Sequence, residues 1–345
     1  MKKAIVSTVL VCMAVRFAVL AGAGEALAAW VREIGPEPPE SAAEAIYEEK
    51  TAATVPESEE AEAAPEWTWV AVTPPPETEK NGEDPGETET PPPAVAADLS
   101  ADALVHNSTS QEINAAALAA AGPGITLEPD APQVLIFHTH SSEAYTPDDI
   151  DRYEASDPYR TEDKNYSVIR VGDALAEKLE ACGLTVVHDR EIYDYPSYTG
   201  SYNRSGAAVE QYLAEYPSIK VVIDLHRDAL GSGDVVYKTQ AALSGKTCAQ
   251  VMMLVGTGEN GLPHPNWKQN LQLALYLQGA AEAAYPGLAR PIELVRERYN
   301  QQLSPGMMIL EVGSSGNTLR EALTAIELFG EAAGKALAAQ IAAES

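Results

Sequence analysis

The sequence predicts an α/β protein: a mainly parallel sheet with helices on both faces, preceded by a disordered linker. Two observations support this fold class. From about residue 101, short apolar runs alternate with longer segments of helical spacing, which is the pattern of βαβ units. The apolar runs are continuous, as in strands that are buried on both faces. With 45% hydrophobic and 21% charged residues, the 345-residue chain can build a packed core.

The first expected elements follow from apolar runs and helix-ending residues. Residues 133–138 (QVLIFH) form a short apolar run, typical of a buried strand. Residues 166–181 have helical spacing, and Gly183 follows as a residue type that often ends helices. A strand is expected at 185–188. The helix expected at 206–215 is closed by a Tyr-Pro pair, because proline disfavours the helical region for the residue before it.

The second half continues the same alternation. Strands are expected at 220–225 (KVVIDL) and 250–255 (QVMMLV), and a helix at 266–284. Another apolar run, MMILEV, predicts a strand at 307–312, and an alanine-rich helix is expected over 317–343. Strands that alternate with helices in this way favour a parallel sheet covered on both faces.

The N-terminal segment 1–30 is expected to direct the chain out of the cytoplasm. Lys2 and Lys3 precede an apolar stretch, 4–24, which is broken only by Arg16. This pattern fits a membrane anchor of one bilayer thickness, or a cleaved signal peptide with an A-x-A site at 26–28. The chain is therefore expected to be extracytoplasmic: membrane-anchored, or secreted if the segment is cleaved.

Residues 31–100 are expected to be a disordered acidic linker, and 101–345 a catalytic domain. Between residues 33 and 100 there are 18 acidic residues against two lysines, which gives −16 of the total charge of −28. The same stretch holds 12 of the 24 prolines. Such a segment cannot bury enough apolar surface to fold, so it is expected to act as a tether.

Charge and cysteine content exclude two classes of protein. The chain has 23 basic and 51 acidic residues, which argues against nucleic acid as a partner because phosphate binding needs a basic face. Its three cysteines cannot form a disulfide framework.

Reactive side chains gather where the expected strands end. His140 and Glu143 follow the first strand with H-x-x-E spacing, His226 follows KVVIDL, and Glu311 lies one residue before the end of MMILEV. Because the carboxyl ends of parallel strands share one edge of the sheet, these groups are expected to converge there. Two imidazoles and a carboxylate are the ligand set of a catalytic zinc ion, which acidifies water and polarises a carbonyl. Glu311 is then expected to be the general base.

Two roles at this edge have alternatives. Glu162 or Asp163, which precede the first helix, could replace Glu143 as the oxygen ligand, although both also suit a helix N-terminus. Arg227 is expected to bind a substrate carboxylate, unless it forms a salt bridge to Asp228 or to another acid.

The remaining histidines and a glycine-rich segment have simpler interpretations. His138 is expected to share a face with His140, as a core histidine or as a group supporting the metal ligands. His188 and His106 are expected at the surface, and His264 as part of a loop. These assignments rest on neighbouring residues alone. The segment 256–261 matches G-x-G-x-x-G, but two prolines delay the following helix, which argues against a dinucleotide site.

Tyrosines form another cluster, before the helix expected at 206–215. Side chains of this kind, with an aromatic body and a polar tip, suit sugar or peptide surfaces, or else simply pack the loop onto the domain. The four are Tyr193, Tyr195, Tyr198 and Tyr202.

Four stretches together resemble the stage II sporulation protein P family. They are HTHSSEAY (138–145), DLHRDA (224–229), VGTGENGLPHPNW (255–267) and MMILEVGSSGNT (307–318). The resemblance covers about residues 133–341, and the apolar N-terminus and long linker are also similar to that family. It implies a fold like that of zinc-dependent N-acetylmuramoyl-L-alanine amidases.

The resemblance also implies an activity and partners. Members of the family are cell-wall hydrolases that cut the N-acetylmuramoyl-L-alanine amide bond, and stem-peptide cross-links, during forespore engulfment. The expected partners are peptidoglycan, the membrane, and the sporulation proteins D and M. Two other functions suit the same residues: a zinc carboxypeptidase or peptidase that acts on stem peptides only, and a non-catalytic peptidoglycan-binding module. Glu311 argues against the binding module, because binding alone needs no base.

Overall fold

The computed structural model describes residues 104–342, except for 233–234 and 244. The expected leader (1–30), linker (31–100) and domain boundary at residue 101 lie outside these residues and stay predictions. Within the described part of the chain, no helix is both long enough and apolar enough to cross a membrane.

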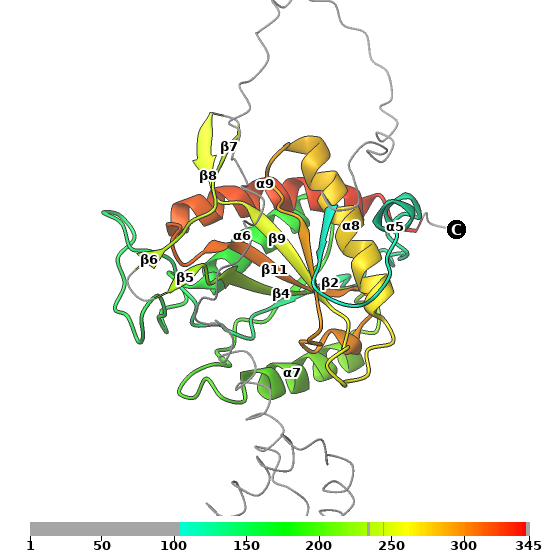
Figure 1. Cartoon of the computed structure of the whole chain (residues 1–345), viewed down its shortest axis with the longest axis horizontal. Coiled ribbons are helices and arrows are strands. Elements are labelled where there is room, and N and C mark those ends of the chain that lie inside the picture. The colour runs from blue at the N-terminus through cyan, green and yellow to red at the C-terminus, as the bar shows by residue number, and fades with distance from the viewer. Residues whose placement is uncertain (1–103, 233–234, 244, 343–345) are drawn as a thin grey trace, which may run out of the picture. The chain divides into compact units, whose positions relative to one another are not determined.

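A seven-stranded sheet forms the centre of the described chain, in the order β1-β10-β9-β11-β4-β2-β3 (Figure 1). Its strands, in chain order, are β1 (Val105–Asn107), β2 (Val134–Phe137), β3 (Val186–His188), β4 (Val221–Asp228), β9 (Val251–Gly256), β10 (Ile292–Val295) and β11 (Met307–Ser314). β11, β4, β2 and β3 run parallel, and so do β9, β10 and β1. The two sets meet in one antiparallel pair, β9 with β11, so the expected, mainly parallel sheet is confirmed.

Helices cover both faces of this sheet, as predicted. On one face, α9 (Leu319–Ala338) packs against α6 (Val168–Ala181) and α8 (Trp267–Ala284). On the other face, α7 (Ser201–Glu215) packs over the middle strands, and Figure 1 shows α7 and α9 on opposite sides of the sheet. The smaller elements are α5 (Ala115–Ala120), η1 (Gln301–Leu303), and two hairpins, β5 (Gly231–Ser232) with β6 (Val235–Val236) and β7 (Ala241–Leu243) with β8 (Lys246–Cys248).

Several bounds differ from the expected ones. α7 begins at Ser201, five residues before the expected start. The sequence pattern does not show this first turn, because the turn is polar and lacks apolar spacing. β4 continues to Asp228, and its polar end residues have partners in the fold: Arg227 donates to Ala144, and Asp228 pairs with Arg290. α9 ends at Ala338, and the short strands β1 and β10 were not expected.

The two-residue period of the strands places the polar residues of β4 and β11 on one face. Val222 of β4 packs in the cluster beneath α7, so Asp224 and His226 face the same side. Met307 of β11 belongs to the same cluster, so Glu311 also faces this side. In the parallel register of the two strands, Glu311 is the partner of His226. Near the carboxyl ends of these two central strands, the face toward α7 thus carries Asp224, His226 and Glu311.

The glycine-rich segment 256–261 lies at the opposite edge of the sheet. It follows β9, whose direction is opposite to that of β2, β4 and β11. Gly258 has a φ of +71° within this loop, and α8 begins only at Trp267. The expected delay of the helix is confirmed, and the loop is separated from the polar edge by the length of the strands.

We predict that Gly172→Ala destabilises the protein. Gly172 lies inside α6, and a Cβ there would be 2.6 Å from His188 Nε2 and 2.7 Å from His138 Nε2. We expect overpacking to lower the free energy of unfolding by about 1–3 kcal/mol. This exceeds the gain of about 1 kcal/mol that alanine brings to a helix interior. Chemical denaturation measures the change.

Gly279→Ala is the matched control. Gly279 lies inside α8, and its Cβ would meet nothing within 4 Å, so this variant is expected to be as stable as the native protein or more stable. A Gly172→Ala protein with native stability would contradict the packing described for His138 and His188.

Candidate metal centre

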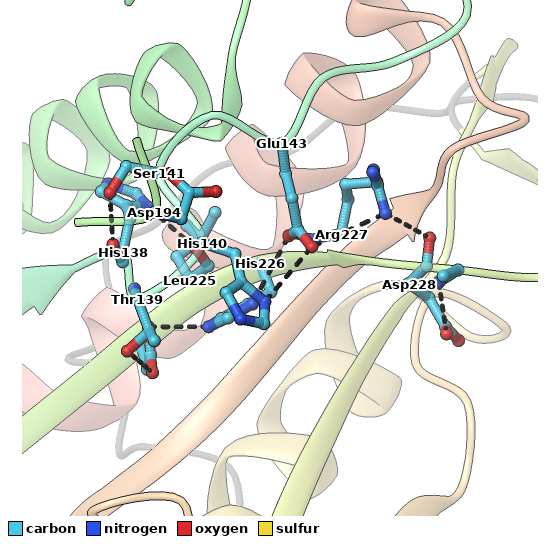
Figure 2. A network of polar contacts seen from close by, with 12 residues as sticks. His138, Thr139, His140, Ser141, Glu143, Asp194, Leu225, His226, Arg227 and Asp228 are labelled. Carbon is cyan, nitrogen blue, oxygen red and sulfur yellow. Dashed lines mark hydrogen bonds and ion pairs between the residues drawn. The ribbon is translucent and has the colours of Figure 1, made fainter. Parts of the chain in front are cut away.

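The three side chains expected to bind metal meet at the carboxyl ends of β2 and β4 (Figure 2). One ligand atom each from His140, Glu143 and His226 lies within 4.8 Å of the other two. His140 Nδ1 is 3.5 Å from Glu143 Oε1, and His226 Nδ1 is 3.4 Å from Glu143 Oε2. All three side chains are largely shielded from solvent. The sequence thus placed these residues correctly with respect to one another.

These separations approach those of a small tetrahedral metal site. Ligand atoms about 2.0–2.2 Å from a tetrahedral zinc ion stand about 3.3–3.6 Å apart. The two nitrogen–oxygen distances fall in that range but end on different oxygens of Glu143, and one ligand atom from each of the three residues lies within 4.8 Å of the others. Two imidazoles and one carboxylate also leave a fourth position for water or substrate. The group can therefore hold a metal ion, and its donor set fits zinc.

Glu143 is held in place by its own backbone. Its N–H donates to the carbonyl of His140 at 3.1 Å, which closes the turn after β2. Its carbonyl accepts the N–H of Val168, the first residue of α6, at 2.8 Å. The start of α6 is further fixed by the Ser167 side chain, which accepts the N–H of Ile169. The carboxylate thus sits on a turn anchored to both a strand and a helix.

Asp224 lies behind His226, on the far side of its ring from Glu143. Its Oδ1 lies 2.8 Å from His226 Nε2, which leaves Nδ1 facing Glu143. Asp224 is fully buried, and it also accepts the N–H and the hydroxyl of Thr139 at 2.8 and 2.7 Å. A carboxylate behind a ligating histidine fixes the ring and increases its basicity.

The charges around Glu143 favour its ionised form. Burial raises the pKa of Glu143, but Arg227, His140 and His226 outweigh burial and hold the pKa well below its ordinary value. Burial lowers the pKa of His226, but the Asp224 and Glu143 carboxylates outweigh it and hold that pKa well above its ordinary value. For His140, burial dominates and lowers the pKa. A histidine kept neutral in this way is available as a ligand.

Glu311 stands beside this group on β11. Its side chain is partly buried, and its Oε2 is shielded from solvent without a hydrogen-bond partner among the described residues. Burial raises the pKa of Glu311 to about 8; the Asp228 carboxylate adds to this, and His226 opposes it. A carboxyl group with such a pKa can both accept and return a proton near neutral pH.

Arg227 is placed differently from the sequence-based expectation. Its side chain is buried, and its Nε and Nη2 donate to the carbonyls of Ala144 and Tyr159 at 3.0 and 3.2 Å. Its Nη1 lies 3.6 Å from Glu143 Oε1. This placement favours the alternative, in which Arg227 is a structural residue paired with an acid.

The other possible oxygen ligands lie away from the histidines. Glu162 and Asp163 have exposed side chains in the loop before α6. Asp163 accepts the backbone and side-chain N–H groups of Asn165. Among the acids considered from the sequence, the structure brings Glu143 to His140 and His226.

His138, which is fully buried, and His188, which is half-buried, form a pair on the α6 side of the sheet. His138 Nδ1 donates to the carbonyl of Leu225 at 2.8 Å, and its Nε2 lies 2.9 Å from His188 Nε2. His138 is thus a core histidine, but it does not share a face with His140. The surface position expected for His188 is wrong: its side chain is only 10% exposed, because Gly172 leaves room for it beneath α6.

The last two histidines lie away from the site. His106 is exposed as expected and pairs with Glu293 of β10 at 2.8 Å. His264 lies in the loop before α8, as expected, and is buried there.

The tyrosine-rich loop borders the metal centre. The ring of Tyr198 in this loop stacks on His140 with 4.7 Å between ring centroids, and Tyr202, in the first turn of α7, makes a T-shaped contact with the same ring at 5.4 Å. The guanidinium of Arg160 lies 5.0 Å from the centre of the Tyr198 ring. This loop does more than pack on the domain, because it forms one wall of the site.

Three residues at the site were not predicted: Asp224, Arg160 and Asp194. A signal existed for Asp224, which precedes His226 by two residues in an otherwise apolar strand and therefore shares its face. Arg160 Nη1 lies 2.6 Å from Asp194 Oδ2, and its Nη2 is 3.5 Å from Glu143 Oε1. Both lie in loops without periodicity, where the sequence gives no such signal.

The fold and the site define the class of protein: an α/β protein with a candidate metal centre at the carboxyl ends of parallel strands. The model of one protein family, stage II sporulation protein P, matches residues 38–333. The chain belongs to this family, as its motifs predicted.

A curated relative and solved structures are also similar to this chain. Stage II sporulation protein P of Bacillus subtilis (strain 168) is 30% identical over 217 residues, which are 59% of this chain and 51% of that protein. The chain thus spans about half the length of this relative. N-acetylmuramoyl-L-alanine amidase AmiC2 of Nostoc punctiforme is 11% identical with a TM-score of 0.34, over 59% of this chain and 94% of that chain. N-acetylmuramyl-L-alanine amidase Ami1 of Mycobacterium smegmatis is 9% identical with a TM-score of 0.37, over 62% and 98%.

We predict that Asp224→Asn weakens zinc binding by about 10- to 100-fold, the usual effect of losing a carboxylate behind a ligating histidine. The amide removes the charge that orients His226 but keeps the side-chain volume. Competition with a chromophoric chelator measures the affinity, with His226→Ala as the reference that loses the metal.

Asp173→Asn is the control, because Asp173 contacts His188 and Arg190 rather than His226. Its zinc affinity is expected to equal that of the native chain. An Asp224→Asn protein with native zinc affinity would show that Asp224 does not position the ligand.

Proposed function

We propose that this chain is a cell-wall hydrolase of sporulating cells that cuts the N-acetylmuramoyl-L-alanine amide bond of peptidoglycan. In this proposal His140, Glu143 and His226 hold a zinc ion, and Glu311 is the general base. Membership of the stage II sporulation protein P family supports a role in sporulation. The observation that carries the chemistry is the His–Glu–His group beside a partly buried glutamate.

The residues around the group suit hydrolysis of an amide. A zinc ion bound there would polarise the scissile carbonyl and acidify a water molecule. Glu311 would accept the proton that water releases on attack at the carbonyl carbon. It would then return the proton to the amide nitrogen as the carbon–nitrogen bond breaks, because an unprotonated amide nitrogen is a poor leaving group. Asp224 holds the imidazole of His226 in the orientation that this arrangement requires.

The setting of the enzyme follows from the same proposal. The leader and the acidic tether would hold the catalytic part outside the cytoplasm, near a membrane and within reach of peptidoglycan. By family resemblance, we further propose action during forespore engulfment together with the sporulation proteins D and M. Cleavage of stem-peptide cross-links is included as a second reaction of the same site.

Digestion of purified peptidoglycan by the full chain tests this function. We expect new amino termini on L-alanine and glycan strands without peptide, identified by mass spectrometry of the products. His226→Ala should yield neither. New termini only within the peptides would instead indicate a stem-peptide peptidase, and retention of the wall material without any new terminus would indicate a binding module.

We predict that Glu311→Gln reduces turnover by about 100-fold or more, the usual scale for a general base. The substitution keeps the shape of the side chain but removes its basicity. Zinc content and melting temperature should stay close to those of the native chain, since Glu311 is not a ligand in this proposal.

Glu293→Gln is the matched control. It changes a carboxylate of β10 that pairs with the exposed His106, and turnover should be unaffected. If Glu311→Gln loses its zinc, Glu311 is a ligand rather than the base. Full activity would place the base elsewhere.

A further inference from the structure

A cavity of about 320 Å³ adjoins the candidate metal centre. It is lined by Ser142, Asp157, Pro158, Arg160, Asp194, Tyr195, Pro196 and Tyr198. Its volume lies at the lower end of the range for small-molecule sites, about 300–1,000 Å³. The lining residues come from loops rather than from the edge of the sheet. No exposed strand edge is therefore presented there to pair with an extended peptide.

The cavity shares a wall with the metal centre. Tyr198 stacks on His140, and Arg160 Nη2 lies 3.5 Å from Glu143 Oε1. Ser142 precedes Glu143 in the chain. A group bound in the cavity would therefore lie next to the candidate metal centre.

The polar floor of the cavity is an ion pair without net charge. Asp194 is buried and accepts both the N–H and the hydroxyl of Ser142, at 3.0 and 2.7 Å. It also accepts Arg160 Nη1 at 2.6 Å. Arg160 and Asp194 neutralise each other, and the exposed carboxylate of Asp157 also lines the cavity, so the lining disfavours an anionic ligand. It places donors and acceptors side by side, which is what hydroxyl groups need, since each both donates and accepts.

Arg160 keeps donors for a ligand. A guanidinium has five N–H groups, and three of its contacts are accounted for, to Ser142, Asp194 and Glu143. The ion pair and the Tyr198 ring fix its plane, so little conformational entropy is lost when a ligand binds. The side chain is 19% exposed, which leaves part of it accessible.

The walls of the cavity are apolar and partly aromatic. Tyr195 is 44% exposed, and Pro158 and Pro196 line the cavity beside it. An aromatic face opposite a polar floor suits a ligand with one apolar face and several hydroxyl groups. A saccharide ring has this character, with C–H bonds on its faces and hydroxyl groups at its rim.

We propose that this cavity is a saccharide subsite that holds the N-acetylmuramoyl ring on the glycan side of the scissile amide. Tyr195 would stack on the ring, and Arg160 with Asp194 would bind its polar rim. This inference rests on the proposed function, because it names the part of peptidoglycan that each side of the metal centre contacts. The stem peptide would leave the metal centre on the side away from the cavity.

The first test measures binding without cleavage. The probe is the N-acetylglucosamine–N-acetylmuramic acid disaccharide whose lactyl carboxyl carries a primary amide in place of the peptide, so that it is uncharged like the substrate. It is titrated into the full chain and followed by saturation-transfer NMR. We expect saturable binding that Tyr195→Ala weakens by about 3- to 10-fold, the scale of one lost aromatic contact. Arg160→Lys, which keeps the charge paired with Asp194 but removes the planar fork, should weaken it as well.

Tyr237→Ala is the matched control, because Tyr237 is 63% exposed and does not line the cavity. It should bind the disaccharide like the native chain. A free stem peptide should bind the Tyr195→Ala and native proteins equally. Absence of disaccharide binding, or native affinity in both Tyr195→Ala and Arg160→Lys, would overturn the inference.

The second test separates this inference from the proposed function. Two substrates carry the same peptide amide, one with the muramoyl ring and one with a lactyl group in its place. Tyr195→Ala should raise KM for the muramoyl substrate about 3- to 10-fold and leave the lactyl substrate and kcat unchanged. Equal effects on both substrates would refute the saccharide subsite. If the native chain cuts neither substrate, the proposed function fails, and the binding test still decides the subsite.

Discussion

The site depends on how one buried carboxylate, that of Glu143, is neutralised. A carboxylate removed from water is costly unless positive groups and donors surround it. The guanidinium groups of Arg160 and Arg227 lie 3.5 and 3.6 Å from its Oε1, and the backbone N–H of Arg227 donates to its Oε2. The remaining neighbours are His140 and His226, which must be neutral to bind a metal. A divalent cation would then supply the positive charge that the imidazoles no longer carry. The two guanidinium groups already supply positive charge to the carboxylate, so it is the donor set, two imidazoles and a carboxylate oxygen, that makes this group a candidate for binding zinc.

The second constraint is the alternation of side chains along a pair of parallel strands. On β4, Asp224 and His226 face the α7 side, while Leu225 between them is buried in the core on the other face. On β11, Glu311 faces the same side and pairs in register with His226. Two strands thus align a buried acid, a candidate metal ligand and a proposed base without a specialised loop. The polar residues are tolerated in central strands because the ends of these strands adjoin the metal centre rather than the apolar core.

The sequence predicts two kinds of feature in this structure: strands that are continuous apolar runs, and polar residues at the ends of these runs. Continuous apolar runs located β2, β4, β9 and β11, and the residues at the ends of these runs gave the His–Glu–His group and Glu311. Asp224 lies inside an apolar run, and the run predicts a strand without indicating that Asp224 contacts His226. Arg160 and Asp194 are 34 residues apart in irregular loops, and only the folded chain brings them together. The burial of His188 could not be predicted from its neighbours in the sequence. It depends on the space that Gly172 leaves in α6, which is distant in the sequence.

The tyrosine-rich loop links the geometry of the metal centre to the shape of the cavity. Arg204 of α7 donates to the carbonyls of Tyr193, Ser197 and Thr199, so one side chain holds the loop along its length. A wall fixed in this way is formed before a ligand arrives, which reduces the entropy lost on binding. Tyr198 lies in this loop and stacks on His140, so replacing it would disturb this candidate ligand and the cavity at once. Tyr195 lines the same cavity without such a contact to a candidate ligand. The two roles of the loop can therefore be separated at Tyr195, where loss of the ring removes a cavity wall and leaves the support of His140 intact.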